Sequence, residues 1–145
     1  MKHSLRCENT KLKVILDSNA LFAPLKFKID IDENLEELLK VPFEPIVLSP
    51  VLKELKTIAR LGSPSMRKKA SCALKLAEKY RVTDVKAEDE NLPDDIIVRI
   101  AGEWKCPVFT NDKQLKKRLR DINVPVIYVR QKSLLKMEGR MFIPV

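Results

Sequence analysis

Five carboxylates are placed where they could act together in one reaction. In chain order they are Asp17, Glu54, Asp94, Asp95 and Asp112. Carboxylates that are gathered without matching cations repel one another, and their pKa values rise unless a positive charge sits between them. Hard divalent metal ions supply that charge, and Mg²⁺ typically takes one or two carboxylates together with waters and substrate phosphates. A bound ion of this kind lowers the pKa of a water and activates it for phosphodiester hydrolysis.

The elements that must hold these acids alternate between apolar strands and helices. Residues 14–16 have no polar alternation, which is typical of a strand in a parallel sheet buried on both faces, and Asp17 follows it directly. Further strands are predicted at 45–49, 81–85, 107–110 and 124–129. The alternation predicts an α/β fold, a three-layer sandwich with a central, mostly parallel sheet. The carboxyl ends of the strands are where ligands bind in such folds.

Helical patterns separate these strands, at 31–40, 50–61, 63–80, 93–104 and 113–120. Ser49 is predicted to cap the second helix, because Pro50 suits the first helical position. In the third helix, Met66 is predicted to face the core together with alanines. The last helix is basic, and only Leu115 and Leu119 need to face inward.

Length and cysteine usage limit the class of protein. A chain of 145 residues is most simply one domain, and we expect it over 12–145, after a flexible tail at 1–11. Cys7, Cys72 and Cys106 are odd in number and far apart, so they predict neither a disulfide framework nor a zinc site. No apolar run approaches about 18 residues, so no membrane-spanning helix is expected. These features predict a cytoplasmic protein without a membrane partner.

The net charge of +8 favours a polyanionic partner, because Lys and Arg neutralise phosphates. We predict that a nucleic acid is contacted by the basic residues that follow Asp112, namely Lys113, Lys116, Lys117, Arg118, Arg120, Arg130 and Lys132. An earlier cluster at 67–69 is interpreted as a solvated helix face. Few aromatic residues are available for base stacking, so sequence-specific readout is not predicted.

Each acid also has a simple structural explanation. Asp94, Asp95 and Asp112 lie where the helix dipole and capping favour acids, and Asp17 could form an ordinary Asx turn. Glu54 is harder to explain in this way, since it lies at the edge of the apolar face of its helix. On a helical wheel Asp94 shares a side with apolar residues whereas Asp95 points away, but the phase of a first turn is unreliable and both are retained.

Two polar residues beside the acids are candidates for a supporting role. Asn19 and Thr110 could orient acids or waters, although a cap or a turn explains each equally well. The single histidine, His3, lies in the expected tail, which argues against a histidine-dependent mechanism.

The ordered set of motifs resembles the PIN-domain nuclease family. It comprises Asp17-Ser18-Asn19 after an apolar strand, Glu54 within SPVLKELK, Asp94-Asp95 opening DDIIVRIAGEWKC, and TND at 110–112, and the resemblance spans 13–139. Within the family, 93–131 most resembles the PIN nucleases of the small-subunit processome. The resemblance implies an endoribonuclease in pre-rRNA processing that uses one or two Mg²⁺ or Mn²⁺ ions. It implies Asp17, Glu54, Asp95 and Asp112 as catalytic acids, with Asp94 as a further metal ligand.

Other functions stay open on the sequence. The resemblance also fits a PIN toxin ribonuclease of a toxin–antitoxin pair, and a third hypothesis is an RNA-binding scaffold without catalysis. A nucleotide-binding α/β domain ranks last, because no G-x-G-x-x-G or Walker loop is present. Ribosome-assembly proteins and a second copy of the chain are the partners that the resemblance implies besides RNA. The three cysteines cannot build the zinc ribbon that some ribosome-biogenesis relatives carry.

Overall fold

A six-stranded sheet forms the centre of the molecule, a computed structural model that describes residues 11–86 and 92–140. The strand order is β3-β2-β1-β4-β5-β6. These strands are β1 (Leu12–Leu16), β2 (Phe43–Leu48), β3 (Arg81–Thr83), β4 (Val108–Phe109), β5 (Val126–Arg130) and β6 (Leu134–Glu138). All neighbours pair in parallel except β5 and β6, which are antiparallel. The predicted α/β fold with a mostly parallel sheet is confirmed.

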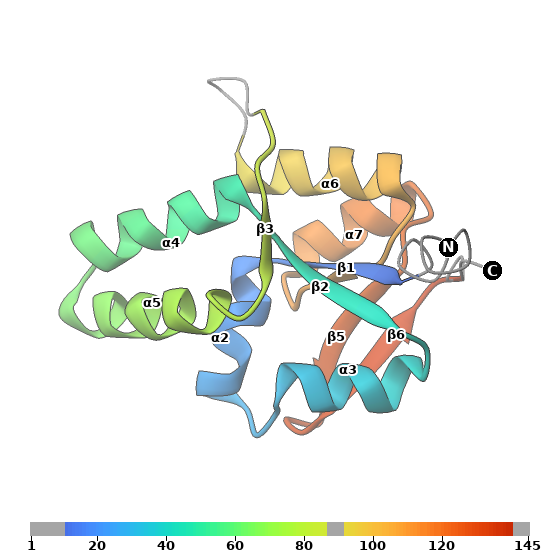
Figure 1. Ribbon diagram of the computed structural model, residues 1–145, viewed down its shortest axis with the longest axis horizontal. Helices are drawn as coiled ribbons and strands as arrows, with labels where there is room; N and C mark the ends of the chain where they lie inside the picture. The colour runs from blue at the N-terminus through green and yellow to red at the C-terminus, as the bar shows by residue number, and fades with distance from the viewer. Residues whose placement is uncertain (1–10, 87–91, 141–145) are drawn as a thin grey trace, which may run out of the picture.

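Helices cover both faces of this sheet (Figure 1). Those described are α2 (Ser18–Lys26), α3 (Ile31–Leu39), α4 (Ser49–Leu61), α5 (Pro64–Ala77), α6 (Pro93–Trp104) and α7 (Lys113–Asp121). In Figure 1, α6 and α7 lie together on one side of the strands and α3 lies on the other. The helices α4 and α5 form a hairpin beside the ends of β1 and β2, and α2 packs against both of them.

The core is built on β1, whose Val14, Ile15 and Leu16 are fully buried. This confirms the strand predicted from the absence of polar alternation, because a strand between two parallel neighbours is covered on both faces. The basic helix α7 buries Leu115 and Leu119, as its spacing predicts.

The order of the strands reverses at β1. From β1 the chain proceeds to β2 and β3 on one side, and then returns to β4 and β5 on the other side. The carboxyl ends of β1 and β4 therefore form a topological switch point, where the following loops separate and leave space for a ligand.

Two elements were not expected from the sequence. The helix α2 contains Pro24, which normally breaks a helix interior, and Asp17 caps its start. The edge strand β6 alternates exposed and buried residues only weakly, and it is held by antiparallel pairing with the preceding strand β5. Of the expected tail, only Lys11 lies within the described residues, and so His3 and Cys7 lie outside them.

Two side-chain predictions were wrong. Ser49 is the first residue of α4 rather than its cap, because its hydroxyl instead accepts a hydrogen bond from the Val85 N–H at 3.0 Å. Met66 is 38% exposed because the first turn of α5 extends beyond the sheet, where only helices lie beside it. Cys72 and Cys106 are both free. Within the described ranges, no helix is long and apolar enough to cross a membrane.

We predict that Ser49→Ala lowers the free energy of unfolding by about 1 kcal/mol, because the partly buried Val85 N–H loses its acceptor. Ser71→Ala is the matched control, since its exposed hydroxyl only donates to the Arg67 carbonyl within α5, and its effect should stay within about 0.5 kcal/mol. Urea denaturation of the three proteins measures both changes. Equal losses in the two variants would contradict a structural role for the Ser49 hydroxyl.

Candidate active site

The candidate site lies where β1 and β4 end side by side. Leu16 of β1 stands opposite Phe109 of β4, and the Asp17 N–H donates to the Phe109 carbonyl at 3.2 Å. Asp17 and Thr110, the residues that follow these two strands, are therefore adjacent although 93 positions separate them in the sequence. This is the switch point of the sheet.

The side chain of Asp17 is held rigidly in this position. Its Oδ1 accepts the Ser18 N–H at 2.8 Å, and its Oδ2 accepts the Thr110 hydroxyl at 2.8 Å. The Thr110 Oγ1 in turn accepts the Asp112 N–H at 3.1 Å. Asp17 is 4% exposed and Thr110 is fully buried, and they are the two buried polar residues of the described ranges. Asp17 therefore does cap the turn that follows β1, as the structural explanation predicts. That role does not explain why its carboxylate is buried.

The environment of Asp17 disfavours its charged form. Burial raises the pKa of Asp17 to about 6, the Thr110 hydrogen bond opposes this, and the charges of Asp94 and Glu54 add to it. Burial also raises the pKa of Glu54, where the Ser18 hydroxyl opposes the rise and Asp94 adds to it. Among the described residues, no cation forms an ion pair with Asp17 or Glu54.

Asp94 and Asp112 complete the group of acids. Burial raises the pKa of Asp94, and the charge of Asp112 raises it further. Asp112 also caps α7, since its Oδ1 accepts the Leu115 N–H at 2.8 Å. The structure thus brings together Asp17, Glu54, Asp94 and Asp112, from the ends of β1 and β4, the second turn of α4 and the first turn of α6.

Asp95 has contacts outside this group, although its charge also raises the pKa of Asp94. Its carboxylate accepts the Leu92 N–H at 3.1 Å, which closes the first turn of α6, and it forms an ion pair with Arg118 at 2.9 Å. The hydrogen bond from Arg118 holds the pKa of Asp95 below its ordinary value. The contacts of Asp95 are those of a cap and an ion pair, whereas Asp94 lies close enough to Asp17 and Asp112 for their charges to act on one another. The helical wheel left both acids as candidates.

The chemistry of these donors fits a hard divalent cation. All four are carboxylates, the pKa values of three are raised, and a hard cation with water ligands prefers oxygen donors. In the described part of the chain, no three Asp, Glu, His or Cys side chains close around a single metal position. The fit to a cation therefore rests on the oxygen donors and on the raised pKa values of Asp17, Glu54 and Asp94.

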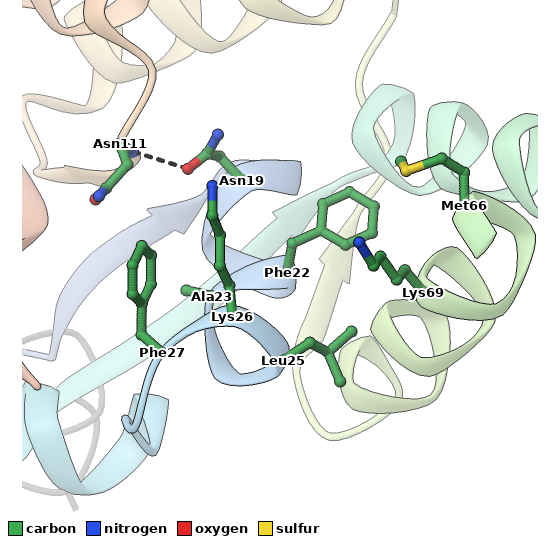
Figure 2. Close-up of a pocket in the computed structure, with 9 residues that line it drawn as sticks. All are labelled: Asn19, Phe22, Ala23, Leu25, Lys26, Phe27, Met66, Lys69 and Asn111. Atoms are coloured by element: carbon green, nitrogen blue, oxygen red, sulfur yellow. Dashed lines mark hydrogen bonds between the residues drawn. The ribbon is translucent and has the colours of Figure 1, made fainter. Parts of the chain in front are cut away.

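Two asparagines fix the loop beside the acids. The Asn111 N–H donates to Asn19 Oδ1 at 3.2 Å, which joins the loop after β4 to α2 (Figure 2). The Asn111 side chain also accepts the Val129 N–H at 2.7 Å and donates to the Val129 carbonyl at 3.5 Å. Asn111 was not singled out in the sequence, although its place between Thr110 and Asp112 was a signal for it.

Several of the predicted RNA-binding residues already have partners on the protein. Arg118 pairs with Asp95, Arg120 pairs with Glu138 at 3.7 Å, and the Lys116 ammonium lies 3.9 Å from the centre of the Tyr128 ring. Such exposed pairs are weak, so their cations remain able to exchange partners for a phosphate. The other predicted contacts, Lys113, Lys117, Arg130 and Lys132, are exposed.

Comparison with known proteins assigns a family to this arrangement. The family described as "PIN like domain" matches residues 14–132. The chain is 35% identical over 130 residues to Ribonuclease VapC4 of Methanocaldococcus jannaschii, which covers 88% of this chain and 97% of that protein. It is 33% identical over 129 residues to the rRNA-processing protein fcf1 of Schizosaccharomyces pombe, covering 80% of this chain but only 58% of that protein.

A solved structure gives the same result. The fold is similar to that of the PIN domain endonuclease Utp24, with a TM-score of 0.73 and 30% identity over 90% of this chain and 94% of that one. The chain therefore belongs to the PIN-domain nuclease superfamily. The resemblance inferred from the ordered acidic motifs is confirmed.

We predict that the metal-free protein loses stability as the pH rises from 4.5 to 7.5. The folded pKa of Asp17 is about 6 and its ordinary value is 3.8, so between these values the folded state binds more protons than the unfolded state. This contribution is complete below pH 3.8 and is lost as the pH passes 6. It amounts to about 2 kcal/mol between pH 4.5 and 7.5.

Asp17→Asn isolates this contribution, because an amide does not titrate. Urea denaturation in EDTA at several pH values should show a loss of about 2 kcal/mol in the wild type that the variant lacks. Parallel pH profiles for the two proteins would contradict a raised pKa at Asp17.

Proposed function

We propose that this chain is a divalent-metal-dependent endoribonuclease that hydrolyses RNA at the joined ends of β1 and β4. The observation that carries the proposal is Asp17, a carboxylate that is 4% exposed and that neighbouring acids further disfavour as an anion. A fold that buries a charge against other like charges loses stability unless a cation is bound there. Membership of a nuclease family supports this interpretation.

Mg²⁺ or Mn²⁺ is the proposed cofactor, as one or two ions, with Asp17, Glu54, Asp94 and Asp112 as the residues that would hold it. When bound, the ion lowers the pKa of a water and offsets charge on the phosphate and the leaving oxygen. The Thr110 hydroxyl keeps Oδ2 of Asp17 in one orientation, and the N-terminus of α7 does the same for Oδ1 of Asp112. Both acids are thus positioned before any ligand arrives, which lowers the entropy cost of binding.

Asp95 is assigned a positioning role in this proposal rather than a place among the ligands. It closes the first turn of α6, on which Asp94 is the preceding residue, and it orients Arg118 of α7. We propose that Arg118 and the other basic residues of α7 and the β5–β6 turn bind the phosphates of RNA, as their charge predicts.

The biological process proposed for the enzyme is maturation of small-subunit rRNA in the cytoplasm. It is supported by the similarity to the rRNA-processing protein fcf1 and to the endonuclease Utp24. Ribosome-assembly proteins and a second copy of the chain are the proposed protein partners. The second candidate is the toxin ribonuclease hypothesis, which is favoured by a match over 97% of Ribonuclease VapC4.

We predict discrete cuts near a mature end when the protein is incubated with a small-subunit precursor rRNA and Mn²⁺ or Mg²⁺. Asp17→Asn and Asp112→Asn should abolish the cuts, because each removes a charged donor without changing shape. Primer extension maps the ends, and tRNA serves as the competing substrate. Cuts confined to tRNA would favour the toxin candidate, and intact RNA under all these conditions would contradict a nuclease.

A second prediction compares the adjacent acids of α6. Asp94→Asn should lower the cleavage rate more than about 100-fold, whereas Asp95→Asn should lower it by about 10- to 100-fold, the usual range for a group that positions a ligand without binding the metal. Isothermal titration with Mn²⁺ should show the same order, with weaker binding only in Asp94→Asn. The two substitutions are matched in chemistry and lie on the same turn. A greater loss with Asp95→Asn would return Asp95 to the ligand set.

A further inference from the structure

A groove between α2 and α5 lies beside the proposed active site (Figure 2). Its volume is about 510 Å³, which is in the range of pockets that hold small organic ligands. Two partly buried phenylalanines of this region, Phe22 and Phe27, line it. Leu25 and Met66 add apolar surface that is 50% and 38% exposed. Apolar and aromatic surface left open to solvent in this way is typical of a binding site.

The charged residues of the groove are both basic. Lys26 ends α2 and its ammonium lies 5.6 Å from the centre of the Phe27 ring, and Lys69 comes from α5. Among the described residues that line the groove, none is acidic. The groove therefore combines flat aromatic surface with positive charge, although 67–69 was interpreted as a solvated face from sequence alone.

The groove is continuous with the acids. Asn19 and Asn111 line it, and they are the residues that join the start of α2 to the loop after β4. Asn19 lies two positions after Asp17, and Asn111 lies directly before Asp112. A linear polymer that is bound at the acids by one monomer would therefore place the adjacent monomer in the groove.

We propose that the groove binds one nucleotide of single-stranded RNA next to the phosphate that is cleaved. Its base stacks on Phe22 or Phe27, and its phosphate lies between Lys26 and Lys69. The inference rests on the proposed function and adds a subsite between α2 and α5 for the nucleotide beside the cleaved phosphate, which a base can enter only when it is unpaired and unstacked from its neighbours. Aromatic stacking accepts any base, so the groove selects single strands rather than a sequence.

The charge of the groove favours RNA over a protein partner. An apolar groove alone would accept a helix of another protein or a second copy of this chain. The described lining of this groove instead combines two phenylalanines with two lysines and holds no carboxylate, which matches a ligand that carries both aromatic bases and phosphates. At the end of the groove, the Asn19 side chain uses its Oδ1 to accept the Asn111 N–H, which leaves its NH₂ group to donate to a base edge or a 2′-hydroxyl.

The test is binding of a fluorescein-labelled oligouridylate, about eight nucleotides long, in EDTA, measured by anisotropy with the intact chain. A series of the same oligonucleotide carries an abasic site at each position in turn. One abasic position should weaken binding by the wild type about tenfold, because one stacked base is lost. Phe22→Leu and Phe27→Leu should abolish this difference between the parent and the abasic oligonucleotide.

Matched substitutions separate the groove from general effects. Lys26→Ala and Lys69→Ala should weaken binding and reduce its dependence on salt, whereas Lys75→Ala on the same helix as Lys69 should not. Phe43→Leu, a partly buried phenylalanine at the start of β2, controls for loss of an aromatic core contact. The lysine variants are at exposed positions, so they test the groove even if a phenylalanine variant fails to fold.

The outcomes distinguish this inference from the proposed function. If groove variants lose the abasic difference but the wild type cuts no RNA, the groove stands and the nuclease proposal fails. If the wild type cuts RNA while the groove variants bind and cut like it, the inference is overturned. The inference is also overturned if a groove variant changes only the oligomeric state of the protein in solution, because the groove would then be an interface between two copies of the chain.

Discussion

The hydrogen bond from the Thr110 hydroxyl to Asp17 joins the two strands on which the candidate site depends. It is made at the switch point of the sheet, where β1 and β4 end together, and it is fully shielded from water on the Thr110 side. Shielding makes the bond strong and also makes the carboxylate costly to ionise. The same contact therefore fixes the geometry of Asp17 and creates its need for a cation.

The other acids depend on the same arrangement. Asp17 and Asp112 cap α2 and α7 with one oxygen each, and so the local helix geometry orients carboxylates that also repel one another. Backbone N–H groups at a helix start favour negative charge, which partly offsets that repulsion. The fold thus keeps several like charges close by giving two of them a structural role as helix caps, while Glu54 and Asp94 lie within α4 and α6 and cap neither helix.

Much of this could be predicted from sequence, because strand burial and helix periodicity are local signals. The apolar run Val14, Ile15 and Leu16, which has no polar alternation, predicted β1, and the ordered acids predicted the family. The division between Asp94 and Asp95 could not be fixed, since it depends on Arg118 of a different helix. Nor could β6 be predicted, because its partner strand rather than its own pattern determines it. The groove needed the structure too, as it joins residues of α2 and α5.

The Asn111 side chain continues the sheet after the backbone has left it. β4 contains only Val108 and Phe109, yet the Val129 N–H and carbonyl of β5 are both bonded, through the Asn111 amide. An amide can serve in this way because it carries a donor and an acceptor in one plane, like a peptide group. Hydrolysis of that amide during storage would place a carboxylate against the Val129 carbonyl and add another negative charge beside Asp112. The loop is therefore a point at which slow chemical ageing would loosen the sheet and the acidic cluster together.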